Sequence, residues 1–144
     1  MIRTSTAVWR GDGLHGKGEL TSQSGALSGQ PYSFHTRFQS EDGKAGTNPE
    51  ELLAAAHAGC FAMAVSFALS EAGHAPQELH VTARVDLVKA DPGFVIKTIG
   101  LELEATVTGL DDAQFQVIAD TAKKNCPLSK ALAATPITLT ARLT

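Results

Sequence analysis

Apolar and polar positions alternate along most of two neighbouring stretches of the chain, residues 79–89 and 94–108. That period of two is typical of half-buried strands. The turn Asp91-Pro92-Gly93 between them predicts a hairpin, and a slip of the alternation around Thr98-Ile99 predicts a bulge. Strands are also predicted at both ends of the sequence, over residues 2–10, 18–24 and 31–38 and from Ile137 to Leu143.

In the middle of the chain the alternation gives way to a long apolar run, which predicts a helix ending at about Ala72. Asn48 can cap this helix, and Pro49 suits its first position. Glu51 stands where the acid of a capping box reaches back. Gly73 can take the positive φ that ends a helix. The boundaries of this helix are therefore marked at both ends.

Two shorter helices are predicted before the last strand. Asp111 can cap the first, and Pro127 opens the second directly after Cys126. The apolar face of the first comprises Phe115, Ile118, Ala119 and Ala122. The resulting order, βββ-α-ββ-αα-β, predicts an α+β fold, and 144 residues suffice for a single domain spanning 1–144.

Residues 52–69 are apolar nearly all round the predicted helix, and eighteen such residues are long enough to raise a membrane span. Alanine and glycine dominate the stretch, however, and acidic Glu50, Glu51 and Glu71 flank it without a bias of positive charge. The amphipathic strands on either side favour a buried core helix of a protein without a membrane segment. One sheet can cover only one face of such a helix. A second copy, packed helix on helix about a two-fold axis, is the simplest cover for the rest.

Composition narrows the class of protein further. The net charge is −3 and the basic residues are scattered, which argues against nucleic acid as a partner. The first residues lack the apolar segment of a signal peptide, so a cytoplasmic location is expected. Two cysteines in a cytoplasmic protein are expected to be reduced and to take part in chemistry rather than to form a structural disulfide. Their spacing is not that of a metal site. No metal or other cofactor is expected.

Cys60 and Cys126 are the candidates for chemistry. Cys60 lies within the long helix, where composition alone favours an inert core thiol, because free cysteines are commonly buried and apolar burial raises a thiol pKa. A reactive Cys60 needs a cation nearby. Cys126 is predicted to be the N-cap of the short helix, where backbone N–H groups favour a thiolate. The alternative for Cys126 is simply a poor cap.

Three other residues have both a functional and a structural interpretation. Glu50 is ten residues from Cys60, or about 15 Å along a helix axis, so it can serve that site only from another chain; otherwise it is an acid in a first helical turn. Arg37 is predicted to end a strand, where most arginines are solvated. His57, one turn before Cys60, suggests a thiol hydrolase but is more typical of a satisfied core histidine.

Two cysteine motifs carry a resemblance to a known family. Gly46-Thr47-Asn48-Pro49-Glu50-Glu51-Leu52-Leu53-Ala54-Ala55-Ala56-His57-Ala58-Gly59-Cys60 and Asn125-Cys126-Pro127-Leu128-Ser129-Lys130-Ala131-Leu132 resemble the OsmC family of osmotically inducible, peroxiredoxin-like proteins. The segments 9–13 and 31–38 are similar to it too. The sequence around Cys60, Ala-Ala-Ala-His-Ala-Gly-Cys-Phe, is closer to the OsmC branch than to the sister branch of organic hydroperoxide resistance proteins.

The resemblance implies an intertwined homodimer, a thiol peroxidase active on organic hydroperoxides and a role in oxidative and osmotic stress. Cys60 would attack the peroxide, and Cys126 would resolve the sulfenic acid to a disulfide. Glu50 and an arginine of the partner chain would hold the thiolate. Arg37 is the candidate, because Lys17, in the loop where the sister branch carries its arginine, lacks the guanidinium fork. An external dithiol, such as a lipoyl or thioredoxin-like protein, would reduce the disulfide.

Two rival functions remain at this point. A non-catalytic dimer could bind small apolar ligands at its interface and keep the same fold without thiol turnover. A Cys/His hydrolase is the weaker rival, since such enzymes usually bring nucleophile and base from separate elements.

Overall fold

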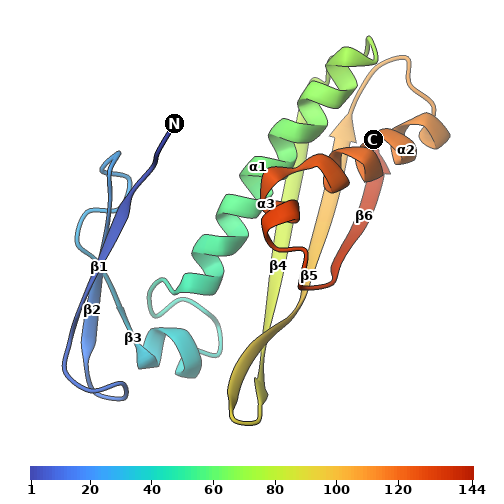
Figure 1. Ribbon diagram of the computed structural model, residues 1–144. Coiled ribbons are helices and arrows are strands. Elements are labelled where there is room, and N and C mark those ends of the chain that lie inside the picture. Colours follow the sequence, from blue (N-terminus) through green and yellow to red (C-terminus); the bar gives the residue numbers. More distant parts are fainter. The chain divides into compact units, whose positions relative to one another are not determined.

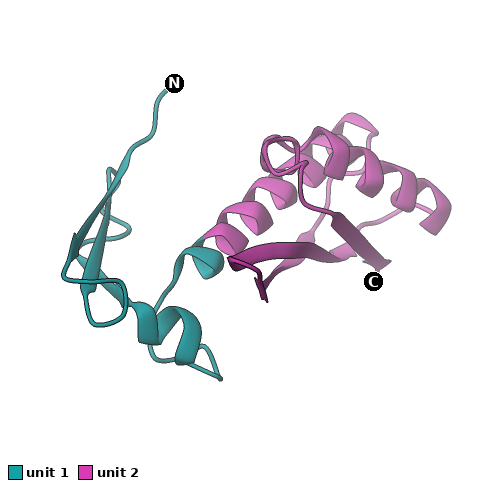
Figure 2. Cartoon of the chain, turned by 60° about the horizontal axis from the view of Figure 1, so that its bottom comes forward, with its two compact units in different colours: residues 1–52 teal, residues 53–144 magenta.

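The computed structural model describes all 144 residues, whose contacts divide into two compact units, residues 1–52 and 53–144 (Figure 2). The elements follow in the order β1-β2-β3-η1-α1-β4-β5-α2-α3-β6 (Figure 1). This is the predicted α+β order with one addition, a π-helical turn η1 at His35–Gln39. The single domain remains a prediction, and each unit is described by itself.

Unit 1 contains an antiparallel sheet of three short strands, β1 Ser5–Arg10, β2 Lys17–Ser22 and β3 Gln30–Ser33. Trp9, Gly18 and Tyr32 stand in register across it, and the two aromatic rings lie 5.4 Å apart between centroids. A Cβ on Gly18 would collide with both rings, so glycine is required there. All of β1 is exposed, and this sheet encloses no core.

Unit 2 is built on the second sheet, β4 Glu78–Ala90, β5 Gly93–Thr106 and β6 Ile137–Leu143. The predicted hairpin joins β4 to β5. Its register shifts where Asp86 faces Thr98 and the next residue, Leu87, faces Ile96, which confirms a bulge close to the predicted position. β6 returns parallel to β5 after the helices α2 and α3. The three helices lie on one face of this sheet (Figures 1 and 2).

Helix α1 spans Pro49–Glu71, close to its predicted limits. The side chain of Asn48 accepts a 2.8 Å hydrogen bond from the backbone N–H of Glu51, so Asn48 is the N-cap. The carboxylate of Glu51 accepts a bond from the hydroxyl of Thr47 at 2.7 Å, in place of the predicted capping-box contact. Gly73 has φ +85°, as expected of a residue that ends a helix.

One stripe of α1, a residue every fourth position, is fully buried: His57, Phe61, Val65 and Leu69. The opposite face is also apolar, yet Met63 and Phe67 are more than 60% exposed there. The expectation that one sheet covers only one face of this helix is therefore confirmed. By length and composition α1 could span a membrane, and 22% of its apolar window is buried in the chain.

The remaining helices are α2, Asp112–Asn125, and α3, Pro127–Ala131. The side chain of Asp111 accepts from the N–H of Gln114 at 2.9 Å and caps α2, as predicted. The core of unit 2 lies between helices and sheet. Its buried members are Phe61, Val65, Leu69, Leu101, Leu103, Ala105, Val107, Leu110, Phe115, Ala119, Ala122 and Cys126.

Candidate active site

The two cysteines meet in the core of unit 2, with their sulfur atoms 3.2 Å apart. α1 supplies Cys60, and the junction between α2 and α3 supplies Cys126. A disulfide would hold the sulfurs at about 2.05 Å, so this is a reduced pair in contact. Cys60 is partly exposed, whereas Cys126 is fully buried. The structure brings together two residues that are sixty-six positions apart in the sequence.

Cys126 is in an environment that favours its thiolate. It ends α2, where its N–H donates to the carbonyl of Ala122, and it is the N-cap of α3, as predicted. Burial raises its pKa, but hydrogen bonds from the backbone N–H and hydroxyl of Ser129 and from Cys60 outweigh burial. The pKa of Cys126 is therefore below its ordinary value.

Cys60 has the opposite environment. Burial raises its pKa most, the backbone N–H of Leu128 lowers it by less than burial raises it, and the neighbouring Cys126 raises it again. No cation is among the groups that act on this thiol. Unit 2 by itself thus favours Cys126 as the thiolate, although the sequence predicted Cys60 as the attacking one. A thiolate on Cys60 needs a positive charge that unit 2 does not provide.

Arg37 and Glu50 meet in unit 1. Their side chains form a two-pronged ion pair, with Nη2 to Oε1 at 2.6 Å and Nε to Oε2 at 3.1 Å. The Glu50 side chain is only 12% exposed and that of Arg37 36%. The fork of a guanidinium matches the two carboxylate oxygens, which fixes the orientation of Arg37. The sequence nominated both residues, and the structure joins them.

The local structure around Arg37 differs from the prediction. Residues 31–38 were expected to be a strand with Arg37 at its end, but β3 stops at Ser33 and Arg37 lies in η1. The Arg37 guanidinium lies over the ring of Phe38, 4.9 Å from its centroid, and Phe34 packs against Phe38. The guanidinium therefore lies beside an aromatic face within a helical turn, an arrangement that the sequence did not reveal.

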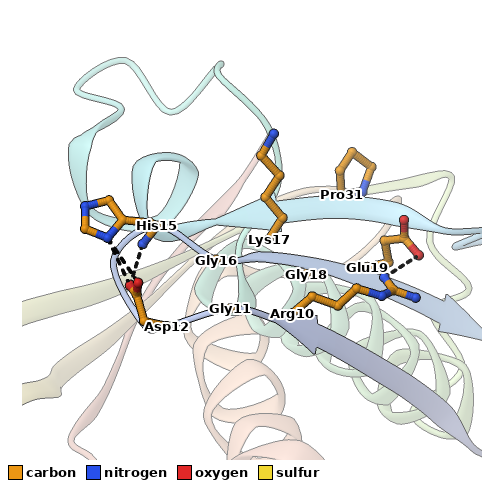
Figure 3. Close-up of a pocket in the computed structure, with 9 residues that line it drawn as sticks. All are labelled: Arg10, Gly11, Asp12, His15, Gly16, Lys17, Gly18, Glu19 and Pro31. Carbon is orange, nitrogen blue, oxygen red and sulfur yellow. Dashed lines mark hydrogen bonds and ion pairs between the residues drawn. The ribbon is translucent and has the colours of Figure 1, made fainter.

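A cavity of about 480 Å³ lies elsewhere in unit 1, around the loop between β1 and β2. Figure 3 shows the residues that line it. Its charged groups are largely paired with one another: His15 with Asp12 at 3.1 Å and Arg10 with Glu19 at 3.7 Å. Lys17 also lines it. No cysteine, serine or threonine lines this cavity, so it holds neither a thiol nor a hydroxyl nucleophile.

A family model described as OsmC-like protein matches residues 41–142, which is more than half of the chain and includes both cysteines. The chain belongs to the OsmC family. Among curated proteins, peroxiredoxin OsmC of Escherichia coli strain K12 is 49% identical over 128 residues, covering 89% of this chain and 87% of the relative. Organic hydroperoxide resistance protein OhrB of Bacillus subtilis strain 168 is 32% identical over 116 residues, covering 79% and 80%.

Solved structures agree with an OsmC-family fold over the whole chain. The crystal structure of OhrB from Bacillus subtilis has a TM-score of 0.68 and 29% identity, covering 98% of both chains. An organic hydroperoxide resistance protein from Elizabethkingia anophelis, with thiocyanate bound, has a TM-score of 0.72 and 25% identity, covering 100% of this chain and 99% of that one. The predicted α+β architecture is confirmed.

Sequence reasoning missed one residue beside the cysteines, Ser129. Its hydroxyl lies 2.8 Å from Nε2 of the buried His57 ring, and Ser129 is among the groups that lower the pKa of Cys126. The sequence left His57 between a core histidine and a hydrolase base. The structure pairs it with Ser129, seventy-two positions away. The available signal was local: Ser129 follows Cys126 by three residues, the spacing at which a side chain returns to its helix cap.

Proposed function

We propose that this protein is a thiol-dependent peroxidase that reduces organic hydroperoxides, with Cys60 as the attacking and Cys126 as the resolving residue. The observation that carries the proposal is the reduced pair of sulfurs 3.2 Å apart. That contact needs a movement of little more than 1 Å to become a disulfide. The relatives named peroxiredoxin and organic hydroperoxide resistance protein support the same activity.

Access divides the two roles. Cys60 is partly exposed and can meet a substrate, whereas Cys126 is fully buried behind it. The pKa order in unit 2 opposes this assignment, because burial and Cys126 both raise the pKa of Cys60. A cation brought to Cys60 reverses that order, since a positive charge near a thiol stabilises its thiolate. The assignment therefore requires such a cation.

The chemistry balances with these two residues and a peroxide. The Cys60 thiolate attacks one peroxide oxygen, the O–O bond breaks, and the leaving alkoxide takes the proton of Cys126 to form an alcohol. Cys60 is now a sulfenic acid and Cys126 a thiolate. Attack of Cys126 on the Cys60 sulfur forms the S–S bond and expels hydroxide, which a solvent proton converts to water. These steps need no metal, flavin or haem.

A homodimer supplies the cation in this proposal, with Arg37 and Glu50 of one chain beside Cys60 and Cys126 of the other. Two features of the single chain support it. Among residues 1–52 only Gly16 and Gly18 are buried, so this unit gains no stability from a core of its own. The uncovered apolar face of α1 likewise needs a partner surface. Both units would then form one domain, 1–144, within an intertwined dimer.

The proposed cycle also needs a reductant, a preferred substrate and a reducing compartment. A dithiol protein, of lipoyl or thioredoxin type, would return the disulfide to two thiols by exchange. Apolar side chains exposed on α1, Met63 and Phe67 among them, would favour an alkyl hydroperoxide over hydrogen peroxide. We place the protein in the cytoplasm, where its thiols are kept reduced, and assign it to defence against oxidative and osmotic stress.

The deciding experiment adds one equivalent of cumene hydroperoxide per chain and follows free thiols and products. We expect both thiols to disappear within the mixing time of a stopped-flow instrument or shortly after, with one cumyl alcohol formed and a Cys60–Cys126 disulfide in the peptide map. Parallel kinetics with hydrogen peroxide should be slower. Tight binding of the peroxide with both thiols intact would instead make this a non-catalytic binder of apolar ligands.

A further inference from the structure

His57 is a buried ionisable residue that the peroxidase steps do not use. It belongs to the buried stripe of α1, one turn before Cys60, and its side chain has no exposed surface. One ring nitrogen, Nε2, lies 2.8 Å from the hydroxyl oxygen of Ser129. The other, Nδ1, has no hydrogen-bond partner. A buried polar ring in an apolar stripe needs a reason, because its desolvation is costly.

The unpartnered Nδ1 decides which nitrogen carries the proton. If Nδ1 held the hydrogen, a buried N–H donor would be left unpaired, and such orphan donors are rarer than orphan acceptors. With the hydrogen on Nε2, the ring donates to Ser129 and leaves only a lone pair unmatched. Ser129 then accepts from His57, which directs its own hydroxyl hydrogen away from the ring.

That hydrogen is then free for the sulfur of Cys126, which occupies the N-cap of the same short helix α3. The backbone N–H groups of residues 128 and 129 and the hydroxyl of Ser129 act on this sulfur and lower the pKa of Cys126 against the effect of burial, and the sulfur of Cys60 lies 3.2 Å away. The ring N–H of His57 thus donates to the hydroxyl of Ser129, and that hydroxyl is left to donate to the sulfur of Cys126. All three residues are buried, so water does not compete with the links.

We propose that His57 is a positioning residue for the resolving step, which acts through Ser129 to hold the thiolate of Cys126 aimed at Cys60. The inference rests on the proposed peroxidase function. When the alkoxide takes the proton of Cys126, the negative charge stays on that sulfur until it attacks the sulfenic acid. A hydroxyl fixed by His57 stabilises the charge without a delay for reorientation.

A base role for His57 is the alternative within the same geometry. In that case Ser129 would pass the proton of Cys126 to Nε2, and the ring would become a buried imidazolium. Burial lowers the pKa of His57, which opposes this charge. The two roles make different demands on a substitute. A base must titrate, whereas a positioning donor needs only an N–H at the place of Nε2, which the side-chain amide of glutamine can supply.

The first test measures the thiolate of Cys126 without any peroxide, in a Cys60→Ser background, by ultraviolet thiolate absorbance against pH. Adding His57→Leu or Ser129→Ala should lower the proportion of thiolate to thiol at a fixed pH about tenfold. His57→Gln should restore most of it. Val65→Ala, at an equally buried position two turns along the same stripe, is the matched control for lost packing and should have no effect.

The second test follows single-turnover oxidation in the chain with both cysteines. His57→Leu should slow disulfide formation about tenfold more than it slows the loss of the first thiol, with sulfenic acid trapped by dimedone in the interval. His57→Gln should again recover. The proposal is overturned if His57→Leu behaves like Val65→Ala, or if His57→Gln is as defective as His57→Leu. A wild type inert to peroxide removes the peroxidase function, while the thiolate titration still tests the link.

Discussion

The thiol pair and the ion pair of this chain are held by opposite physical means. Cys60 and Cys126 sit in the hydrophobic core of unit 2, where packing fixes their geometry and burial raises the pKa of Cys60. Arg37 and Glu50 sit in unit 1, which encloses no apolar core and holds them by hydrogen bonds to each other. The thiol pair has a fixed position in a core but no cation near Cys60, whereas the ion pair has a cation but no core around it.

This difference gives the proposed dimer a physical reason to divide its thiol chemistry between two subunits. A guanidinium placed permanently inside an apolar core costs several kcal/mol of desolvation unless it is fully paired. A guanidinium held by a carboxylate at the surface avoids that cost and can be presented to a thiol by assembly. Five predictions test the proposed roles of the thiol pair, the ion pair and the core of unit 2, from the largest expected effect to the smallest.

Cys60→Ser should abolish peroxide reduction while the fold stays intact, because an alcohol at this site is no nucleophile near neutral pH. Steady-state turnover of cumene hydroperoxide, together with circular dichroism, checks this. Activity above a small fraction of wild type would move the attack to Cys126, as the pKa order within unit 2 alone suggests.

Arg37→Ala should also be nearly inactive, and mixing it with Cys60→Ser should recover activity. After joint unfolding and refolding, half of the dimers are mixed, and each has one complete site of two, so recovery should reach about a quarter of wild type. Arg37→Lys is the control for charge without the fork and should be intermediate. No recovery, with mixed dimers seen by native mass spectrometry, would mean that each subunit builds its own site.

Cys126→Ser should react once with peroxide and then stop. Without the resolving thiol, Cys60 should accumulate as sulfenic acid and proceed to sulfinic and sulfonic acids in excess peroxide. Intact-protein mass spectrometry records these forms as successive additions of oxygen. An unmodified Cys60 after such treatment would contradict the resolving role.

Phe115→Ala should destabilise the protein by about 3–5 kcal/mol, because Phe115 is fully buried in the core of unit 2. Val117→Ala is the matched control on the same helix, since Val117 is 67% exposed, and should change stability by about 0.5 kcal/mol or less. Urea unfolding at fixed protein concentration measures both. Similar costs at the two positions would show that α2 is covered on both faces, by an assembly larger than the core described.

The smallest effect concerns acid stability. Burial lowers the pKa of His57, so below the ordinary histidine value of 6.5 the unfolded chain binds a proton at this residue more readily than the folded chain does. The free energy of unfolding should therefore fall as the pH drops below 6.5. His57→Gln cannot titrate and should flatten this part of the pH profile. Unfolding free energies at pH 7.5 and pH 5 compare the two. Identical slopes would mean that His57 takes up a proton as readily in the folded protein as in the unfolded chain.

The sequence determined most of the local structure, because its signals are local. The caps at Asn48 and Asp111, the stop at Gly73 and the hairpin between residues 79 and 108 each depend on neighbours within a few positions, and the structure has them all. The two cysteine motifs were equally local, and they sufficed to indicate the family.

Only the tertiary structure decided which of these residues meet. Cys60 reaches Cys126 and His57 reaches Ser129 across about seventy positions, through the packing of α1 against α3, and no periodicity encodes such a contact. Arg37 was predicted to end a strand because residues 31–38 follow a glycine-rich turn and look like a strand. Its pairing with Glu50 and its packing on Phe38 accompany a π-helical turn instead, since tertiary contacts override the weak preference of a short segment.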